Sequence, residues 1–132
     1  MVITKAEVFG MRRITYCPIG IRMHTDTGLF GDGEVALAYG RASNAAYGML
    51  KDLVPLIVGM DPLDTEVIWN KIYNEIFWTQ NGGPVVYGGI SAIDMALWDI
   101  KGKAFKAPVY KLLGGKNNPR LRTYASQLQF YW

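Results

Sequence analysis

Residues 88–115 read "GGISAIDMALWDIKGKAFKAPVYKLLGG", and this stretch gives the strongest fold signal in the chain. Apolar residues recur in it every three or four positions, which predicts a helix from Ile90 to about Phe105. They are Ile93, Ala96, Leu97 and Ile100. Asp99 and Lys103 add an i,i+4 ion pair of the favourable orientation to the same helix.

Two further helices are predicted on the N-terminal side of this one. Ser43 is a good N-cap for a helix whose apolar stripe ends at Ile57. Asp61 followed by Pro62 is a start signal for the second helix. The segment "WTQNGGPVVYGG" (78–89) is rich in glycine and is predicted to be a loop.

The first third of the chain has the pattern of β-structure. Residues 19–25, "IGIRMHT", alternate apolar and polar side chains as a half-buried strand does. Residues 2–10 and 29–37 are predicted as its neighbours, and "DTG" (26–28) as a tight turn. The connection 11–18 is too long for a minimal hairpin, and such loops often carry binding residues.

The C-terminal part changes character. "APVYKLLGG" (107–115) predicts a short helix closed by two glycines, and "KNNP" (116–119) predicts a turn. "RLRTYASQLQFYW" (120–132) then has the composition of a strand with buried contacts. No segment follows that could pair with this strand, and alone it would favour aggregation. Residues 1–115 are therefore expected to be one α+β domain, and residues 116–132 the first piece of something else.

Composition excludes several classes of protein. The 132 residues are 50% apolar and 19% charged, which favours a packed core over disorder. The net charge of +3 is too small and too little clustered to predict nucleic-acid binding. No signal peptide or membrane-spanning stretch is recognisable. Cys17 is the only cysteine, so we expect no internal disulfide and a reducing, cytoplasmic compartment.

Four motifs resemble the N-terminal part of the enolase superfamily, in its mandelate racemase and muconate-lactonizing branch. They are "TDTGLFGDGE" (25–34), "LVPLIVGMDPLD" (53–64), the 88–115 stretch quoted above and "LRTYAS" (121–126). Within that branch, "EVALAYG" (34–40) and "YASQLQF" (124–130) are most similar to acid-sugar dehydratases such as galactonate dehydratase-like proteins.

The resemblance implies a fold. Residues 1–115 would form an enolase-like N-terminal capping domain, a three-stranded antiparallel sheet followed by helices. Residues 116–132 would be the linker and the first strand of a (β/α) barrel that is otherwise absent from this chain. We therefore expect the chain to be a fragment, or part of an enzyme about three times longer.

The resemblance also implies an activity. Family members abstract the proton beside a carboxylate and stabilise the enediolate on Mg²⁺, and a dehydratase then expels the β-hydroxyl. The metal ligands and the catalytic bases come from later barrel strands, beyond Trp132. The resemblance therefore places no catalytic residue and no metal ligand within this chain, which alone should be inactive.

What the capping domain would supply is recognition of the substrate, a sugar acid. Its two loops match residues 11–18 and 37–44, and the end of the first barrel strand lies near the same site. Arg and Tyr side chains suit the carboxylate and hydroxyls of a sugar acid. The candidate substrate-binding residues are Arg13, Tyr16, Tyr39, Arg41, Ser126 and Gln129. The family often assembles through its capping domains, so a homo-oligomer is expected.

Three other patterns are interpreted as structural. "KGK" (101–103) imitates a K-x-K base motif, but it ends a helix, where cations are favoured. Asp32 and Glu34 share one face of a strand, but two carboxylates are too few for a hard cation. His24 is interpreted as a packing residue.

Two alternatives remain open. The longer enzyme could be a racemase or cycloisomerase of the same superfamily, because the bases that separate these reactions lie beyond Trp132. The chain could also be a stand-alone α+β interaction module that recruits a partner through its exposed strand.

Overall fold

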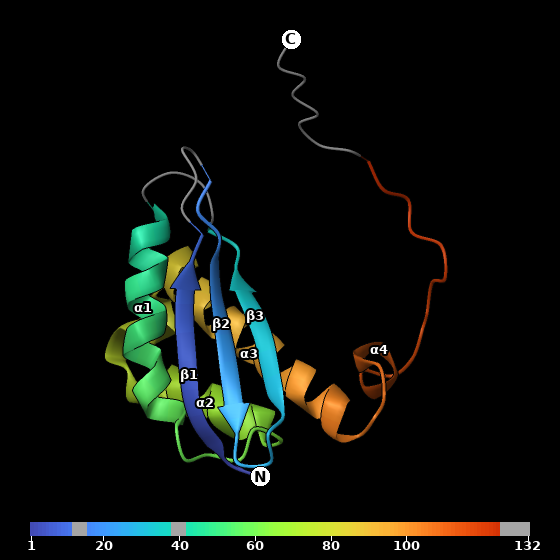
Figure 1. Ribbon diagram of the computed structural model, residues 1–132. Helices are drawn as coiled ribbons and strands as arrows, with labels where there is room; N and C mark the ends of the chain where they lie inside the picture. The colour runs from blue at the N-terminus through green and yellow to red at the C-terminus, as the bar shows by residue number, and fades with distance from the viewer. Residues whose placement is uncertain (12–15, 38–41, 125–132) are drawn as a thin grey trace.

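Three strands, β1 (Ile3–Gly10), β2 (Ile19–Thr25) and β3 (Phe30–Val35), form one antiparallel sheet in the order β1-β2-β3 (Figure 1). They belong to a computed structural model that describes residues 1–11, 16–37 and 42–124. The alternation in β2 buries Ile21 and Met23 on one face and leaves Arg22 on the other. The bounds predicted for the central strand are confirmed.

The helices are α1 (Ala42–Ile57), α2 (Thr65–Glu75), α3 (Gly83–Ala104) and α4 (Val109–Leu112), with a 3₁₀ turn, η1 (Phe77–Asn81), between α2 and α3. In Figure 1, α3 crosses behind the sheet. The largest buried side chains come from the inner face of the sheet and from the first three helices. They include Ile3, Ile21, Met23, Leu50, Leu53, Ile68, Ile72, Ile93, Leu97 and Ile100. Within the described residues, no helix is both long enough and apolar enough to cross a bilayer.

The backbone of α3 lies directly against β3. A Cβ atom at Gly33 would overlap the carbonyl oxygen of Ala92, and one at Gly31 would overlap that of Ala96. The two glycines therefore allow an approach that no other residue permits at these positions. The sequence predicts a structural role for the residues around Gly31 and Gly33. The close contact between β3 and α3 is the physical cause of that role.

The outer edge of β3 is closed by two side chains of α3. The backbone N–H of Asp32 donates to Asp99 Oδ2 over 3.0 Å, and Lys103 Nζ donates to the carbonyl oxygen of Phe30 over 2.7 Å. Asp99 and Lys103 also pair with each other at 2.7 Å, as the i,i+4 spacing predicts. An unpaired strand edge is a template for aggregation, and this pair covers part of it.

Three predicted helix boundaries are wrong. Helix α1 begins at Ala42, so Ser43 lies buried inside it and is not its N-cap. Helix α2 begins at Thr65, because Asp61 instead holds a turn by accepting the N–H of Leu63 at 2.9 Å.

The third wrong boundary is that of α3, which begins at Gly83, so more than half of the predicted loop 78–89 is α-helical. Gly88 and Gly89 allow neighbouring side chains to pack closely against the backbone of α3. A Cβ at Gly88 would lie 3.0 Å from Val35 Cγ1, and one at Gly89 would lie 3.1 Å from Leu53 Cδ1.

The chain after α4 is extended and exposed. Residues 116–124 form no strand, although 121–124 begin the predicted barrel strand. Leu121 and Tyr124 are exposed, because no described strand lies beside them to pair with this segment. Residues 125–132, the rest of the predicted strand, lie outside the described residues.

Replacing Gly33 by alanine should destabilise the chain by about 3 kcal/mol, since the added Cβ displaces α3 from β3. Gly48→Ala is the matched control, because Gly48 is exposed within α1 and its Cβ would meet nothing within 4 Å. That substitution should stabilise the chain by about 0.5–1 kcal/mol. Urea unfolding measures both, and equal stabilities for the two variants would contradict the close contact.

Asp99→Asn should cost about 1 kcal/mol, because it weakens the ionic hydrogen bond to the Asp32 N–H as well as the pair with Lys103. Glu75→Gln breaks an i,i+4 pair with Lys71 on α2 whose length is similar, 2.8 Å, but which touches no strand. It should cost less than about 0.5 kcal/mol. Unfolding free energies that are alike for the two variants would show that the strand edge contributes nothing.

Candidate functional site

The strand register brings the described flanks of the two predicted substrate loops to one end of the sheet. Gly10 is paired with Ile19, and Ile19 with Val35, so β1 ends, β2 begins and β3 ends at the same level. The backbone N–H of Met11 donates to the carbonyl oxygen of Pro18 over 3.0 Å, which closes the base of the first loop. Helix α1 also begins at this end, the upper end in Figure 1. The segments that flank residues 12–15 and 38–41 therefore converge.

Of the six candidate substrate-binding residues, only Tyr16 lies within the described part of the chain. It is 37% exposed and precedes β2 by three residues, at the end of the sheet where β1 ends and β2 begins. The other five are Arg13, Tyr39, Arg41, Ser126 and Gln129, and they lie outside the described residues. Their assignment stays a prediction.

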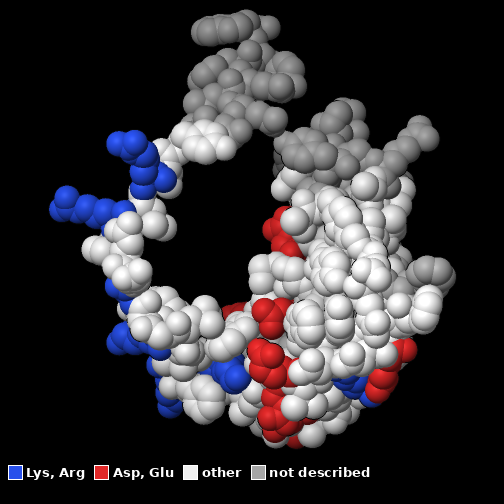
Figure 2. All heavy atoms as spheres, turned by 180° about the vertical axis from the view of Figure 1, so that it is seen from behind, with Lys and Arg blue, Asp and Glu red and all other residues white. Residues whose placement is uncertain are grey.

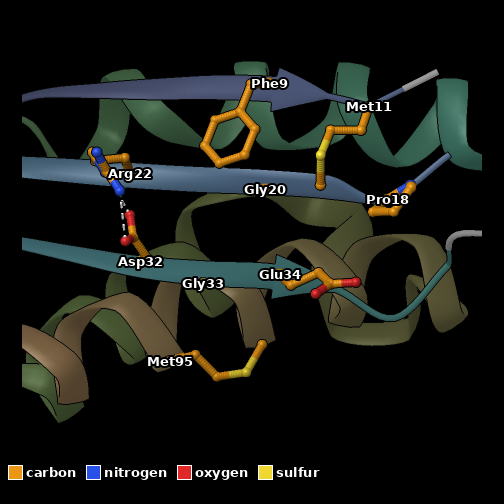
Figure 3. A pocket seen from close by; sticks show the side chains of 9 residues that line it. All are labelled: Phe9, Met11, Pro18, Gly20, Arg22, Asp32, Gly33, Glu34 and Met95. Atoms are coloured by element: carbon orange, nitrogen blue, oxygen red, sulfur yellow. Dashed lines mark hydrogen bonds and ion pairs between the residues drawn. The ribbon is translucent and has the colours of Figure 1, made fainter.

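A groove of about 410 Å³ lies on the outer face of the sheet, near the same end. Figure 3 shows Phe9 and Met11 on one side of it, Met95 of α3 on the other, and Gly20 and Gly33 between them. The sequence pattern does not predict this groove. Its signal is Gly20, a glycine at an outward position of β2, where a Cβ would lie 2.5 Å from the ring of Phe9.

Arg22 and Asp32 form a bidentate ion pair across β2 and β3 at the end of this groove. The Nε and Nη2 atoms of Arg22 donate to the two carboxylate oxygens over 2.7 and 2.8 Å. These hydrogen bonds hold the pKa of the Asp32 carboxyl below its ordinary value and raise the pKa of the guanidinium. The guanidinium also lies 4.4 Å from the centre of the Phe30 ring. Asp32 is thus engaged in holding the sheet.

A divalent metal ion does not fit the described residues. Residues 1–11, 16–37 and 42–124 contain no group of three or more His, Cys, Asp or Glu side chains that could hold one. Glu34 shares the outer face with Asp32 but brings no third ligand. The bidentate pair with Arg22 gives Asp32 a structural role.

The lysines of "KGK" also have structural partners. Lys101 Nζ lies 4.8 Å from the centre of the Trp98 ring and 3.4 Å from Thr65 Oγ1. Lys103 closes the β3 edge as described above. Both lie in the last turn of α3, where a helix favours positive charge.

Asp94 is a half-buried carboxylate of α3. Burial raises the pKa of its carboxyl, and the charge of Glu66 on α2 raises it further, while a hydrogen bond with Trp98 acts in the opposite direction. At neutral pH the folded protein therefore stabilises the charged form of the Asp94 carboxyl less well than water does.

Charge is distributed unevenly along the chain. All eleven acidic residues precede residue 100, whereas seven of the fourteen basic residues follow it. Figure 2 shows the consequence, with acidic side chains on the back of the sheet-and-helix body and basic ones along the extended C-terminal stretch, separated by a hollow.

The family model for the mandelate racemase / muconate lactonizing enzyme N-terminal domain matches residues 11–114. The chain belongs to this family. The match includes the whole of β2, β3 and the four helices, so the fold described above is that of the family's N-terminal domain.

Two relatives of known activity are acid-sugar dehydratases. A D-mannonate dehydratase of Novosphingobium aromaticivorans is 38% identical over 89% of this chain, and a D-galactonate dehydratase of Verminephrobacter eiseniae is 44% identical over 79%. The chain spans only 30% and 26% of their respective lengths. It therefore matches less than a third of each enzyme.

Solved structures of the enolase superfamily share the fold. A superfamily member from Salmonella typhimurium has a TM-score of 0.91 and 48% identity, covering 99% of this chain and 34% of its own. An enolase from Pantoea ananatis, solved with bound D-gluconate and Mg, has a TM-score of 0.77 and 33% identity, with coverages of 89% and 28%. The 3,6-anhydro-D-galactonate cycloisomerase of Zobellia galactanivorans has a TM-score of 0.79 and 32% identity, with coverages of 90% and 33%.

Asp94→Asn should stabilise the chain at pH 7 by less than about 1 kcal/mol, because the amide avoids the cost of the charge and can still accept the bond from Trp98. The pKa of the Asp94 carboxyl is higher in the folded state than its ordinary value of 3.8. The charged carboxylate therefore lowers the free energy of unfolding, and this loss is complete at pH values above the raised pKa. The advantage of the variant should therefore shrink as pH falls and be absent below the unfolded value.

Thermal melts of Asp94→Asn and of the control Asp52→Asn, at an exposed position of α1, measure this effect at pH 7 and pH 4. A loss of stability in Asp94→Asn at pH 7 would contradict the unfavourable charge.

Proposed function

We propose that this chain is the substrate-specificity portion, or capping domain, of a Mg²⁺-dependent acid-sugar dehydratase. The observation that carries the proposal is the convergence of the segments flanking residues 12–15 and 38–41 at one end of the sheet. Loops held side by side on a rigid sheet suit the recognition of a small polar substrate. The dehydratase relatives support the substrate class, since D-mannonate and D-galactonate are both sugar acids.

The proposed reaction removes water from the substrate. A base outside this chain takes the proton from the carbon beside the carboxylate, and the hydroxyl on the next carbon leaves with a proton as water. The resulting enol rearranges to a 2-keto-3-deoxy acid. Mg²⁺, bound by residues beyond Trp132, would stabilise the negative charge that develops on the carboxylate oxygens, and the relative with bound D-gluconate and Mg supports this cofactor.

The residues of this chain would bind and orient the substrate. Arg13 and Arg41 would pair with carboxylate or hydroxyl oxygens, and Tyr16 and Tyr39 would hydrogen-bond the distal hydroxyls. Ser126 and Gln129 would act from the end of the first barrel strand, where binding groups gather in such barrels. The two loops would also exclude water from the reacting carbons.

A second candidate is a cycloisomerase or racemase of the same superfamily. The likeness to the Zobellia galactanivorans cycloisomerase favours it, because that protein shares the fold at an identity close to that of the gluconate-bound structure. These reactions begin with the same proton abstraction but lose no water.

One experiment separates the two candidates. The natural polypeptide that carries this sequence is incubated with Mg²⁺ and a panel of sugar acids in D₂O, and products are followed by NMR and by an assay for 2-keto acids. A dehydratase forms a 2-keto-3-deoxy acid. Deuterium at the carbon beside the carboxylate without any keto acid identifies a racemase, and no reaction with any sugar acid would contradict the proposal.

Arg13→Gln and Tyr16→Phe in that polypeptide should each lower kcat/KM for the sugar acid by about 10-fold to 100-fold, mainly through KM. Each removes a hydrogen bond to a charged or hydroxylated substrate, worth about 1.5–3 kcal/mol for the charged partner. Lys116→Gln is the control, because this exposed lysine lies in the segment after α4. Kinetics for Arg13→Gln that match the control would remove this loop from the substrate site.

A further inference from the structure

A second groove, of about 370 Å³, lies between α3 and α4. Met95 and Trp98 of α3 line one side of it, and Val109 and Leu113, at the two ends of α4, line the other. Met95 is 42% exposed and Leu113 64%. Exposed apolar side chains that gather around a hollow mark a contact surface more often than scattered ones do.

Two carboxylates, Asp94 and Asp99, lie in the same groove. Asp99 has a cationic partner, because the Nζ atom of Lys103 lies 2.7 Å from its Oδ2 atom. Asp94 shares a hydrogen bond with Trp98, but it forms no ion pair with any residue that the structure describes. The groove therefore holds one carboxylate whose charge is balanced and one whose charge is not.

The surroundings of Asp94 favour a cation as its partner. Burial raises the pKa of its carboxyl, the negative charge of Glu66 on α2 raises it further, and the charge of Lys101 lowers it only weakly. The Lys101 ammonium has other contacts, since it lies 4.8 Å from the centre of the Trp98 ring and 3.4 Å from Thr65 Oγ1. An added positive charge close to Asp94 would stabilise the carboxylate that these groups leave unfavourable.

The rest of the natural polypeptide is the available source of that cation. The C-terminal stretch leaves α4 beside this groove, and Figure 2 shows a hollow between that stretch and the body of the domain. The Salmonella typhimurium structure matches 99% of this chain with a TM-score of 0.91, so it shares the position of the stretch as well. Because the match covers only 34% of that structure, a polypeptide of its length has further chain with which to fill the hollow.

We propose that the groove between α3 and α4 receives a part of the natural polypeptide that follows Trp132, and that Asp94 binds a lysine or arginine side chain of that part. Asp94 is then a positioning residue, which fixes this domain relative to the rest of the polypeptide. The apolar side chains of Met95 and Leu113 are covered in the same contact. The contact requires no particular reaction, so it stands whether or not the polypeptide is a dehydratase.

The test is the effect of Asp94→Asn on the natural polypeptide, measured by thermal unfolding at pH 7 and pH 4. The substitution leaves the bound cation without its partner, so it should lower the unfolding midpoint at pH 7 by at least about 2 °C. The loss should be smaller at pH 4, because a carboxylate that a cation stabilises loses this stabilisation as it gains a proton. In the 132-residue chain alone the same substitution should be stabilising at pH 7, so the sign of the effect reports the contact.

Asp52→Asn is the matched control, since it removes a carboxylate from an exposed position of α1. It should leave the midpoint of the natural polypeptide within about 1 °C of the wild type. The proposal is overturned if folded Asp94→Asn is as stable as Asp52→Asn at pH 7. A loss of equal size at pH 7 and pH 4 overturns it too, because no charge would then be paired.

Leu113→Ser tests the apolar part of the contact and leaves the charge of Asp94 in place. Because Leu113 is largely exposed in the structure, the substitution should cost little in the 132-residue chain. In the natural polypeptide it should lower the midpoint by at least about 2 °C at both pH values. A midpoint that stays at the wild-type value would show that nothing covers the groove, and circular dichroism shows whether each variant is folded.

Discussion

The arrangement of this domain depends on one contact, that between the backbone of α3 and two glycines of β3. Because Gly31 and Gly33 have no side chain, the carbonyl oxygens of Ala96 and Ala92 approach the strand directly. The helix is thereby fixed in register with the strand. This register lets Asp99 accept the N–H of Asp32 and lets Lys103 donate to the carbonyl oxygen of Phe30, two backbone groups at the outer edge of β3.

The same contact orients the end of the sheet at which the proposed substrate loops begin. The N-terminal half of α3 lies beside the end of β3, where Gly88 faces Val35 and Leu37. The sheet register brings the flanks of both loops to this end, and the core fixes the strands between them. The buried scaffold can thus stay constant while the loops vary. That division suits a domain whose family members act on different sugar acids, since specificity then changes without repacking the core.

Much of this fold could be predicted from the sequence, for reasons visible in particular residues. The alternation from Ile19 to Thr25 defines β2 to the residue, because one face of that strand is fully buried. The start of α3 was missed because glycine disfavours helices locally, and only the folded chain shows Gly88 and Gly89 making room for Val35 and Leu53. The groove was missed because it combines β1, β2, β3 and α3. Of the candidate site, only Tyr16 and the flanks of the two loops lie within the described residues, so the assignment of substrate-binding residues stays a prediction.

Hydrogen–deuterium exchange of the natural polypeptide, with and without a sugar acid and Mg²⁺, tests the central claim most directly. The claim is that this domain recognises the substrate through the loops at one end of its sheet. The account predicts that the substrate slows exchange in peptides covering residues 11–18 and 37–44 and leaves β2 and the core of α3 unchanged. Substrate binding that protects other parts of the polypeptide but neither loop would contradict it.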